Sequence, residues 1–305
     1  MICFKCRKVV ADEKDAVYGL HKECFERWFR LSEAIEFTGV ARKETDSDKE
    51  RNEPFSQFNS SFFQGKFRKY SASLNGVDYI LKVEEKEYPE LPATEFLCNE
   101  IARFFKMEVP EFYLIDFHGR KTFVSKNFIN KNKIMALHHI YHYFQKDELF
   151  DVETLIRIIE KQTGQVSEVE RFVKLCLFDA LIGNHDRHGR NLAFIEEAKG
   201  HTALSPFYDN PTYIGVEEDI LLGAQHDPKG KIATRLTNEP TMKDYAAEFI
   251  QTGHRIQVEE FMNDVDLEKL GMIVSESFIS QKRKAALMRI ISERTMELKN
   301  VLENQ

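Results

Sequence analysis

Two loops of the sequence carry polar residues of the types that phosphoryl transfer uses. Asp186 is followed five residues later by Asn191, and Asp209 closes the later segment 205–209. Such a reaction needs a carboxylate that orients the attacking hydroxyl and oxygen ligands that hold Mg²⁺. The spacing from Asp to Asn is that of a kinase catalytic loop. We therefore predict that Asp186, Asn191 and Asp209 are catalytic and that the last two bind Mg²⁺.

A simpler interpretation of this first loop is a turn with a capping aspartate, which a four-residue match alone would favour. The kinase interpretation is preferred because Asn191, Asp209 and an upstream strand lysine follow in the order that a kinase needs. His185 and His188 lie three residues apart without a nearby cysteine, which is a poor transition-metal pattern. We expect both histidines to orient the loop, and we place His188 among the nucleotide-binding residues.

The remaining parts of a nucleotide site are predicted upstream. A nucleotide needs a lysine on its phosphates, an acidic partner for that lysine and a covering loop. Lys82 lies at the end of an apolar strand pattern, and Glu95 in the next helix is its expected partner, with Glu100 as the alternative. Segment 60–66 is the candidate covering loop, with a single glycine. The competing interpretation places Lys82 on a solvated strand edge and Glu95 on a solvated helix face.

A second cluster lies near the N-terminus, where Cys3 and Cys6 form one pair and His21 and Cys24 form another. The 14 residues between the pairs allow two short turns to close tetrahedrally on one Zn²⁺. Chance clustering of reduced cysteines is the alternative. We predict that these four residues bind a structural zinc ion, in a module with a structural or partner-docking role.

A sheet and several helices must position these residues. Strand patterns at 67–74 and 77–83 flank Asn75-Gly76, which is a strong hairpin signal. A second hairpin is expected at 112–117 and 122–128. Apolar residues at helical spacing predict helices at 93–106, 134–145, 151–162, 167–182 and 276–303. Ser167, three residues before Glu170, is the expected N-cap of the fourth helix.

This order of elements predicts an α+β protein with a bilobal protein kinase-like fold, consisting of a small β-rich N-lobe and a helical C-lobe, with an N-terminal zinc-knuckle module. A shift to almost wholly polar composition near residue 41 indicates a linker. The predicted units are the zinc-knuckle module at 1–40, the linker at 41–56, the N-lobe at 57–130 and the C-lobe at 131–305.

Composition restricts the class of protein further. The 305 residues carry a formal net charge of −7 and are 42% hydrophobic, which indicates a soluble globular protein without direct nucleic-acid binding. No stretch approaches the roughly 20 apolar residues of a membrane-spanning helix, and the N-terminus lacks the apolar run of a signal peptide. We therefore expect a cytoplasmic location and no membrane span.

The motifs resemble those of the HipA/HipT family of bacterial toxin–antitoxin serine/threonine kinases, from about Ser60 to at least Asp209. Segment 181–188 with Asn191 is similar to the catalytic loop of the family, and segment 206–209 is similar to its metal-binding motif. Further matches to the family are Gln64, Lys66, Lys82 and Glu95.

The resemblance implies an ATP- and Mg²⁺-dependent kinase with a protein substrate, such as an aminoacyl-tRNA synthetase or another translation component. It also implies a DNA-binding antitoxin and a small antitoxin subunit as partners. Ser60 and Ser61 are the implied autophosphorylation candidates. The implied nucleotide-binding set consists of Lys82, Glu95, Ser61, Gln64, Lys66 and His188.

Two departures from the family lie in the covering loop. Phe62 stands where the family usually has a glycine, and Asn59 where the first loop serine often lies. A kinase of phosphoinositides or another small molecule is one alternative function, although the acidic chain does not suggest a lipid-facing surface. A pseudokinase that serves as a binding module is another, favoured by Phe62 and opposed by the intact Asp186, Asn191 and Asp209.

Overall fold

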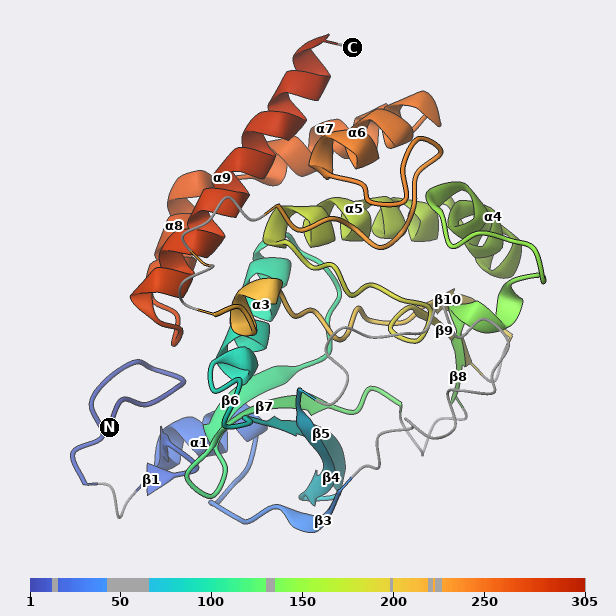
Figure 1. The fold of residues 1–305 in the computed structure, drawn as a ribbon. Coiled ribbons are helices and arrows are strands. Elements are labelled where there is room, and N and C mark those ends of the chain that lie inside the picture. Colours follow the sequence, from blue (N-terminus) through green and yellow to red (C-terminus); the bar gives the residue numbers. More distant parts are fainter. Residues whose placement is uncertain are drawn as a thin grey trace.

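The computed structural model describes residues 1–12, 16–42, 66–129, 135–197, 200–218, 222 and 227–304. A β-rich region lies at one end of the molecule and a helical region at the other, with helix α3 (Leu91–Phe104) between them (Figure 1). No helix in these ranges is long and apolar enough to cross a membrane.

The β-rich region contains an antiparallel sheet of five strands in the order β3-β4-β5-β7-β6. These strands are β3 (Thr38–Arg42), β4 (Arg68–Leu74), β5 (Val77–Val83), β7 (Lys121–Lys126) and β6 (Phe112–Asp116). Asn75 and Gly76 join β4 to β5 with φ values of 49° and 74°, as a two-residue hairpin turn requires. Both predicted hairpins are confirmed. Strand β3 includes the first two residues of the predicted linker, and the domain boundaries stay predictions.

Both faces of this sheet pack against hydrophobic core, except at the edge strand β3, which is exposed. Phe112 and Leu114 pack with α3 in one core cluster, whereas the alternating residues Tyr113 and Ile115 belong to a second cluster. The second cluster is completed by the N-terminal elements β1 (Ala16–Val17), β2 (Leu20–His21) and α1 (Lys22–Phe29). The N-terminal module therefore forms part of the core of the β-rich region.

The helical region is built around helix α5 (Val166–Ile182), which packs against α4, α6, α7 and α9. Its other helices are α4 (Val152–Thr163), α6 (Met242–Gln251), α7 (Arg255–Asp264), α8 (Leu267–Ser275) and α9 (Gln281–Asn304). The region also holds a small antiparallel sheet of β8 (Met135–His139), β9 (Ala193–Glu197) and β10 (Thr202–Leu204), and the 3₁₀ turns η4 (Ile140–Tyr143) and η5 (Tyr213–Gly215).

The predicted helix at 134–145 is wrong. This segment forms strand β8 and turn η4, and β8 pairs along its length with β9. The pairing extends beyond the strand itself, because Ile140 donates its backbone N–H to Leu192 O at 2.9 Å. Backbone partners distant in the sequence thus satisfy a segment whose apolar spacing alone suggested a helix.

Two predicted helix starts also need correction. Helix α5 begins at Val166 with Gln165 as its N-cap, so that Ser167 lies inside the first turn. The last helix begins at Gln281, five residues later than predicted, because α8 ends at Ser275 and a short connector follows. The connector packs Phe278 and Ile279 against the core, which is why its apolar residues extended the helical pattern.

Candidate active site

Lys82 on β5 joins three elements of the fold. Its neighbours Leu81 and Val83 face the N-terminal module, and Lys82 points to the opposite face, toward α3. The ammonium Nζ donates to Glu95 Oε1 on α3 at 2.5 Å and to Asp209 Oδ1, in the loop after β10, also at 2.5 Å. The predicted pair of Lys82 and Glu95 is therefore present, and both residues are buried. The alternative partner Glu100 instead contacts Arg7.

The charges in this cluster support one another. Burial would raise the pKa of the Asp209 carboxyl, but Lys69 and Lys82 outweigh it and hold that pKa well below its ordinary value. Lys69 Nζ lies 3.7 Å from Asp209 Oδ2. Burial would lower the pKa of Lys82, whereas the Asp209 and Glu95 carboxylates raise it above its ordinary value. Asp209 is therefore ionised, which is the form that binds a metal ion.

Asp209 also has an uncommon backbone conformation. Its φ is 52°, in the left-handed region that non-glycine residues seldom adopt and that Asp and Asn tolerate best. Such conformations often occur at functional sites, where surrounding contacts hold them in place. Here the contact with Lys82 is one of those that fix the carboxylate.

The predicted catalytic loop begins where α5 ends. Gly183, with a φ of 70°, closes the helix, and a Cβ atom at this position would lie 2.8 Å from Pro228 Cγ. Within the loop, Asn191 Oδ1 accepts the backbone N–H of His188 at 2.8 Å, and Asn191 Nδ2 donates to the backbone carbonyl of Asp186 at 2.8 Å. Asn184 Oδ1 accepts the backbone N–H of Asp186 at 3.0 Å. Two asparagine side chains therefore hold the backbone of Asp186.

A buried guanidinium group connects this loop to the Asp209 segment. Arg187 Nε donates to Asp179 Oδ2 on α5 at 2.7 Å. Its Nη1 donates to the carbonyl oxygens of Asn191 (3.2 Å) and Tyr208 (2.9 Å), and its Nη2 donates to Asn210 Oδ1 (2.7 Å). Asn191 and the residue preceding Asp209 are therefore held side by side.

The sequence analysis did not assign Asp179, Arg187 or Asn210 a role. A signal was available for Asp179, since an aspartate within the otherwise apolar segment 175–182 of helix α5 needs a buried partner. Asn210 extends the network to α3, because its Nδ2 donates to Asn99 Oδ1 at 3.0 Å. The network thus spans α3, α5 and both loops of the site.

His188 is neutral in this setting. Burial, and to a smaller extent the positive charge of Lys231, lower the pKa of His188 to about 3. Its Nδ1 accepts the backbone N–H of Arg190 at 3.2 Å, so the ring orders the turn that leads to Asn191. His185 lies in the same loop, with its ring centroid 6.4 Å from that of Tyr213. The assignment of His188 to nucleotide binding remains a prediction.

Two further lysines act electrostatically on Asp186. Burial lowers the pKa values of Lys66 and Lys231, and the Asp186 carboxylate opposes this change in both. The sequence analysis assigned Lys66 and missed Lys231, which lies in a loop without a distinctive motif. This loop is held in place because Gly230 packs directly on Tyr245, whose hydroxyl donates to Ile232 O at 2.7 Å.

The rest of the predicted covering loop lies outside the described residues. This applies to Ser60, Ser61 and Gln64, and to the departures at Asn59 and Phe62. Their assigned roles remain predictions.

The four predicted zinc ligands come together in space. The ligand atoms of Cys3, Cys6, His21 and Cys24 all lie within 4.8 Å of one another. His21 Nδ1 is 3.4 Å from Cys6 Sγ and 3.8 Å from Cys24 Sγ. All five cysteines of the chain are free of disulfides. The arrangement has the donor set and the compactness of a tetrahedral metal site.

Two thiols of this cluster differ in how readily they ionise. Burial raises the pKa of Cys3, but the backbone N–H groups of Cys6 and His21 reverse the effect and lower that pKa to about 6. Burial and the adjacent Cys6 and Cys3 raise the pKa of Cys24 to about 12. A cation between the sulfur atoms would stabilise all of them as thiolates.

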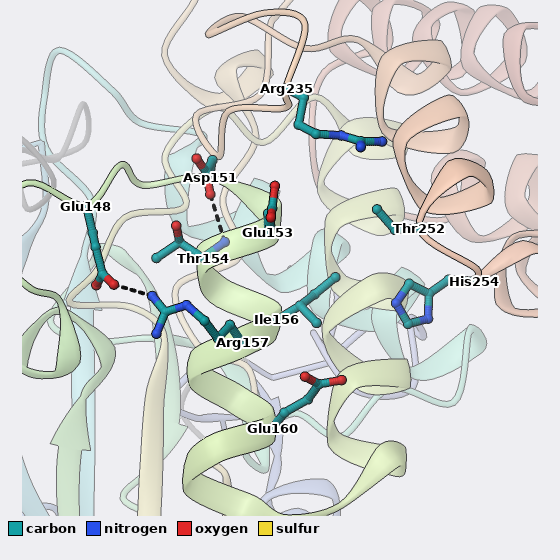
Figure 2. Close-up of a pocket in the computed structure, with 10 residues that line it drawn as sticks. All are labelled: Glu148, Asp151, Glu153, Thr154, Ile156, Arg157, Glu160, Arg235, Thr252 and His254. Carbon is teal, nitrogen blue, oxygen red and sulfur yellow. Dashed lines mark hydrogen bonds and ion pairs between the residues drawn. The ribbon is translucent and has the colours of Figure 1, made fainter.

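Figure 2 shows a pocket in a different part of the molecule, along α4. Two of its lining arginines are engaged in ion pairs, Arg157 with Glu148 and Arg235 with Glu248. None of its lining residues belongs to the predicted sites, so we assign the pocket to the helical scaffold. The residues that line it are Glu148, Asp151, Glu153, Thr154, Ile156, Arg157, Glu160, Arg235, Thr252 and His254.

The fold and the site define a kinase-like protein, since a strand lysine paired with a helical glutamate and a loop aspartate is the arrangement of kinases. The HipA-like C-terminal domain family matches residues 58–284, and the chain belongs to this family. Among solved structures, the kinase CtkA of Helicobacter pylori is similar with a TM-score of 0.64 and 16% identity, over 77% of this chain and 93% of CtkA.

A second solved structure is HipA of Shewanella oneidensis, in a complex with HipB and operator DNA. It is similar with a TM-score of 0.58 and 13% identity, over 89% of this chain and 76% of that protein. At these identities the two likenesses show the fold alone.

Two curated proteins named as candidate kinases also match. Y4dM of Sinorhizobium fredii is 27% identical over 154 residues, which are 44% of this chain and 37% of Y4dM. A protein of Haemophilus influenzae is 23% identical over 261 residues, 71% of this chain and 76% of its own length. The match to Y4dM thus spans little more than a third of that protein.

Proposed function

We propose that the protein is an ATP- and Mg²⁺-dependent kinase that phosphorylates serine or threonine hydroxyls of a protein substrate. The observation that carries this proposal is the Lys82 ammonium group, which binds Glu95 and Asp209 at once. In kinases a lysine held in this way contacts the nucleotide phosphates, next to the aspartate that holds the metal ion. Membership of the HipA-like family supports the same conclusion.

The residues present fit a magnesium ion. Asp209 offers an ionised carboxylate, and Asn191 Oδ1 keeps a lone pair beyond the hydrogen bond that it accepts from His188. Mg²⁺ prefers such hard oxygen ligands, together with phosphate oxygens. When bound, the magnesium ion would neutralise negative charge on the phosphates.

In this proposal the other residues bind and orient the reactants. Asp186 accepts a hydrogen bond from the attacking hydroxyl, and Lys82 binds phosphate oxygens while Glu95 keeps it in place. Lys66 and His188 belong to the nucleotide site with Ser61 and Gln64. As the new P–O bond to the hydroxyl oxygen forms, the bond between the γ-phosphorus and ADP breaks, ADP leaves with the electron pair, and the hydroxyl proton passes to Asp186.

The family suggests a substrate and partners. We propose a translation component, such as an aminoacyl-tRNA synthetase, as the substrate, and autophosphorylation on Ser60 or Ser61 as regulation. The S. oneidensis HipA structure, which holds HipB and operator DNA, supports a DNA-binding antitoxin as a partner of this chain. A small antitoxin subunit is the second proposed partner.

Labelled ATP provides the test. Purified protein is incubated with γ-labelled ATP, Mg²⁺ and cell lysate, in parallel with an Asp186→Asn variant. We expect a labelled protein band that decreases about 10²- to 10⁴-fold in the variant. Asp264→Asn, which alters a surface carboxylate paired with Lys174, should retain full labelling.

Other outcomes contradict the proposal. Label in lipid would indicate a phosphoinositide kinase instead. Binding of ATP without transfer to any acceptor would indicate a pseudokinase. Phosphoamino-acid analysis of the labelled band tests the specificity for serine and threonine, and mass spectrometry of the kinase itself tests Ser60 and Ser61.

A further inference from the structure

The Cys/His cluster has the geometry of a metal site. This holds for its four ligand atoms and for the hydrogen bond that orients the histidine ligand. A Zn–S bond of about 2.3 Å implies that sulfur ligands lie about 3.8 Å apart in a tetrahedron. The four ligand atoms of this cluster all lie within 4.8 Å of one another, which is compact enough for such a site. His21 Nε2 is 3.1 Å from the carbonyl oxygen of Val9 and donates to it. This contact directs Nδ1 toward the cysteines and fixes the tautomer that a metal ion needs.

The turn that carries Cys3 and Cys6 is tightly bonded. The N–H of Cys3 donates to Lys8 O at 3.0 Å, and the N–H of Arg7 donates to Cys3 O at 2.9 Å. Arg7, directly after Cys6, has a φ of 60°, which is uncommon outside glycine. The direction of the Arg7 side chain is thus set by the conformation of the ligand turn.

Arg7 joins the β-rich region to the helical region. Its Nη1 lies 2.8 Å from Glu276 Oε2 at the end of α8, and its Nη2 lies 3.4 Å from Glu100 Oε2 on α3. Phe4, on the same turn, packs edge-on against Phe278 with ring centroids 5.1 Å apart. Phe4 contacts both core clusters of the molecule. The turn therefore lies at the seam between the two regions.

The seam is coupled to the site through α3. Glu100 is five residues beyond Glu95 on this helix, and Glu95 is the partner of Lys82. The start of α3 is tied to the helical region separately, because Glu90 Oε2 accepts the N–H of Ser280 at 2.6 Å. Arg7 is therefore a second attachment, farther along the helix.

We propose that Cys3, Cys6, His21 and Cys24 bind one Zn²⁺, and that the zinc-bound turn braces α3 against α8 so that Glu95 stays on Lys82. The zinc site stands independently, whereas the consequence for phosphoryl transfer rests on the proposed kinase function. Removal of zinc is then a means of regulating the enzyme from outside its active site.

The first experiment measures the metal. Full-length protein purified under reducing conditions should contain one zinc ion per chain, as measured by inductively coupled plasma mass spectrometry. The Cys6→Ser variant should lose this zinc ion. Cys98→Ala, which alters a buried cysteine of the helical core, should keep the zinc. If Cys6→Ser does not fold, Co²⁺ substitution of the wild-type protein replaces it, with thiolate-to-cobalt and tetrahedral d–d absorption bands expected. A protein without bound metal and without these bands overturns the site.

The second experiment tests the brace with a variant that leaves the ligands intact. Arg7→Met should keep its zinc, accelerate hydrogen exchange in α3 and reduce phosphoryl transfer roughly 2- to 10-fold. The control is Arg30→Met, the same change at an exposed arginine of the same module. Glu100→Gln removes only one of the two ion pairs of Arg7, so it should reproduce part of the effect of Arg7→Met. The double variant should be no worse than Arg7→Met alone, because that substitution already removes the contact with Glu100.

The outcomes separate the two proposals. Unchanged hydrogen exchange in α3 of Arg7→Met overturns the brace, whatever the activity. Faster exchange in a protein whose wild type transfers no phosphate supports the brace and contradicts the kinase function. Wild-type activity that Arg7→Met leaves unchanged, with zinc bound, contradicts the coupling to Lys82.

Discussion

At the scale of single residues, the site depends on how buried charges are paired. Lys82 and Glu95 have almost no exposure to solvent, so that each charge relies on the other and on Asp209. Arg187 of the catalytic loop is buried in the same way, and the carboxylate of Asp179 on α5 neutralises its charge. Their loss is therefore expected to affect stability as well as activity.

Lys82→Met should destabilise the fold. The substitution leaves Glu95 buried without its cation, which costs about 3 to 5 kcal/mol in comparable buried pairs. Urea unfolding followed by circular dichroism measures this cost. Lys69→Met is the matched control, because Lys69 is more than one-third exposed and its loss should cost less than about 1 kcal/mol. Equal effects of the two substitutions would show that burial does not decide the stability of the cluster.

The sequence was informative about some of these residues because their signals are local. Asp186 and Asn191 are five residues apart in one loop, and Lys82 and Glu95 follow each other as strand and helix. The contact of Arg187 with Asn210 spans 23 positions and depends on how two loops meet. Nothing in the local pattern of either residue predicts that contact.

At the scale of elements, local sequence signals were enough to predict the hairpins. The wrongly predicted element, strand β8, depends instead on pairing with a distant strand. Asn75-Gly76 suffices to predict the turn between β4 and β5, because its backbone preference fits a two-residue hairpin. Strand β8 has no comparable signal, because its partner β9 lies more than 50 residues away in the sequence, as in the pair His139 and Ala193. Its backbone hydrogen-bond partners therefore come from a distant segment of the chain.

Gly183 at the end of α5 offers a test at this scale. Gly183→Ala should cost about 2 kcal/mol or more, since φ is positive and the new methyl group would meet Pro228. It should also reduce phosphoryl transfer, because the catalytic loop starts there. Gly164→Ala, at the end of α4, has a similar φ with open space around it and should cost only about 1 kcal/mol. Thermal unfolding and the labelling assay measure both, and an active Gly183→Ala protein would contradict the role of this position.

At the scale of the whole molecule, the N-terminal module and the sheet share one core. Phe29 of α1 stacks on Tyr113 of β6 with ring centroids 4.2 Å apart. The polar composition after residue 41 suggested a separate unit, because composition reports solvent contact and not what a preceding segment covers. The arrangement of the module on the sheet could be learned only from the structure.

The single tryptophan reports on this shared core. Trp28 contacts both core clusters, with its ring 6.1 Å from Phe96 on α3 and 5.4 Å from Tyr113 on β6. We expect unfolding in urea to give coincident curves for Trp28 fluorescence and for far-ultraviolet circular dichroism. A fluorescence transition at a lower urea concentration than the circular dichroism transition would mean that the N-terminal module detaches before the rest of the protein unfolds. The Phe29→Ala variant should shift both curves together.

The ammonium group of Lys82 has a fixed number of hydrogen-bond donors. It has three N–H donors, and among the described residues two carboxylate oxygens accept from it, one from α3 and one from the Asp209 loop. One donor position then remains for a third acceptor, such as a phosphate oxygen. A nucleotide would complete a coordination that the protein has already ordered on two sides, so its binding need not break the contact of Lys82 with Glu95.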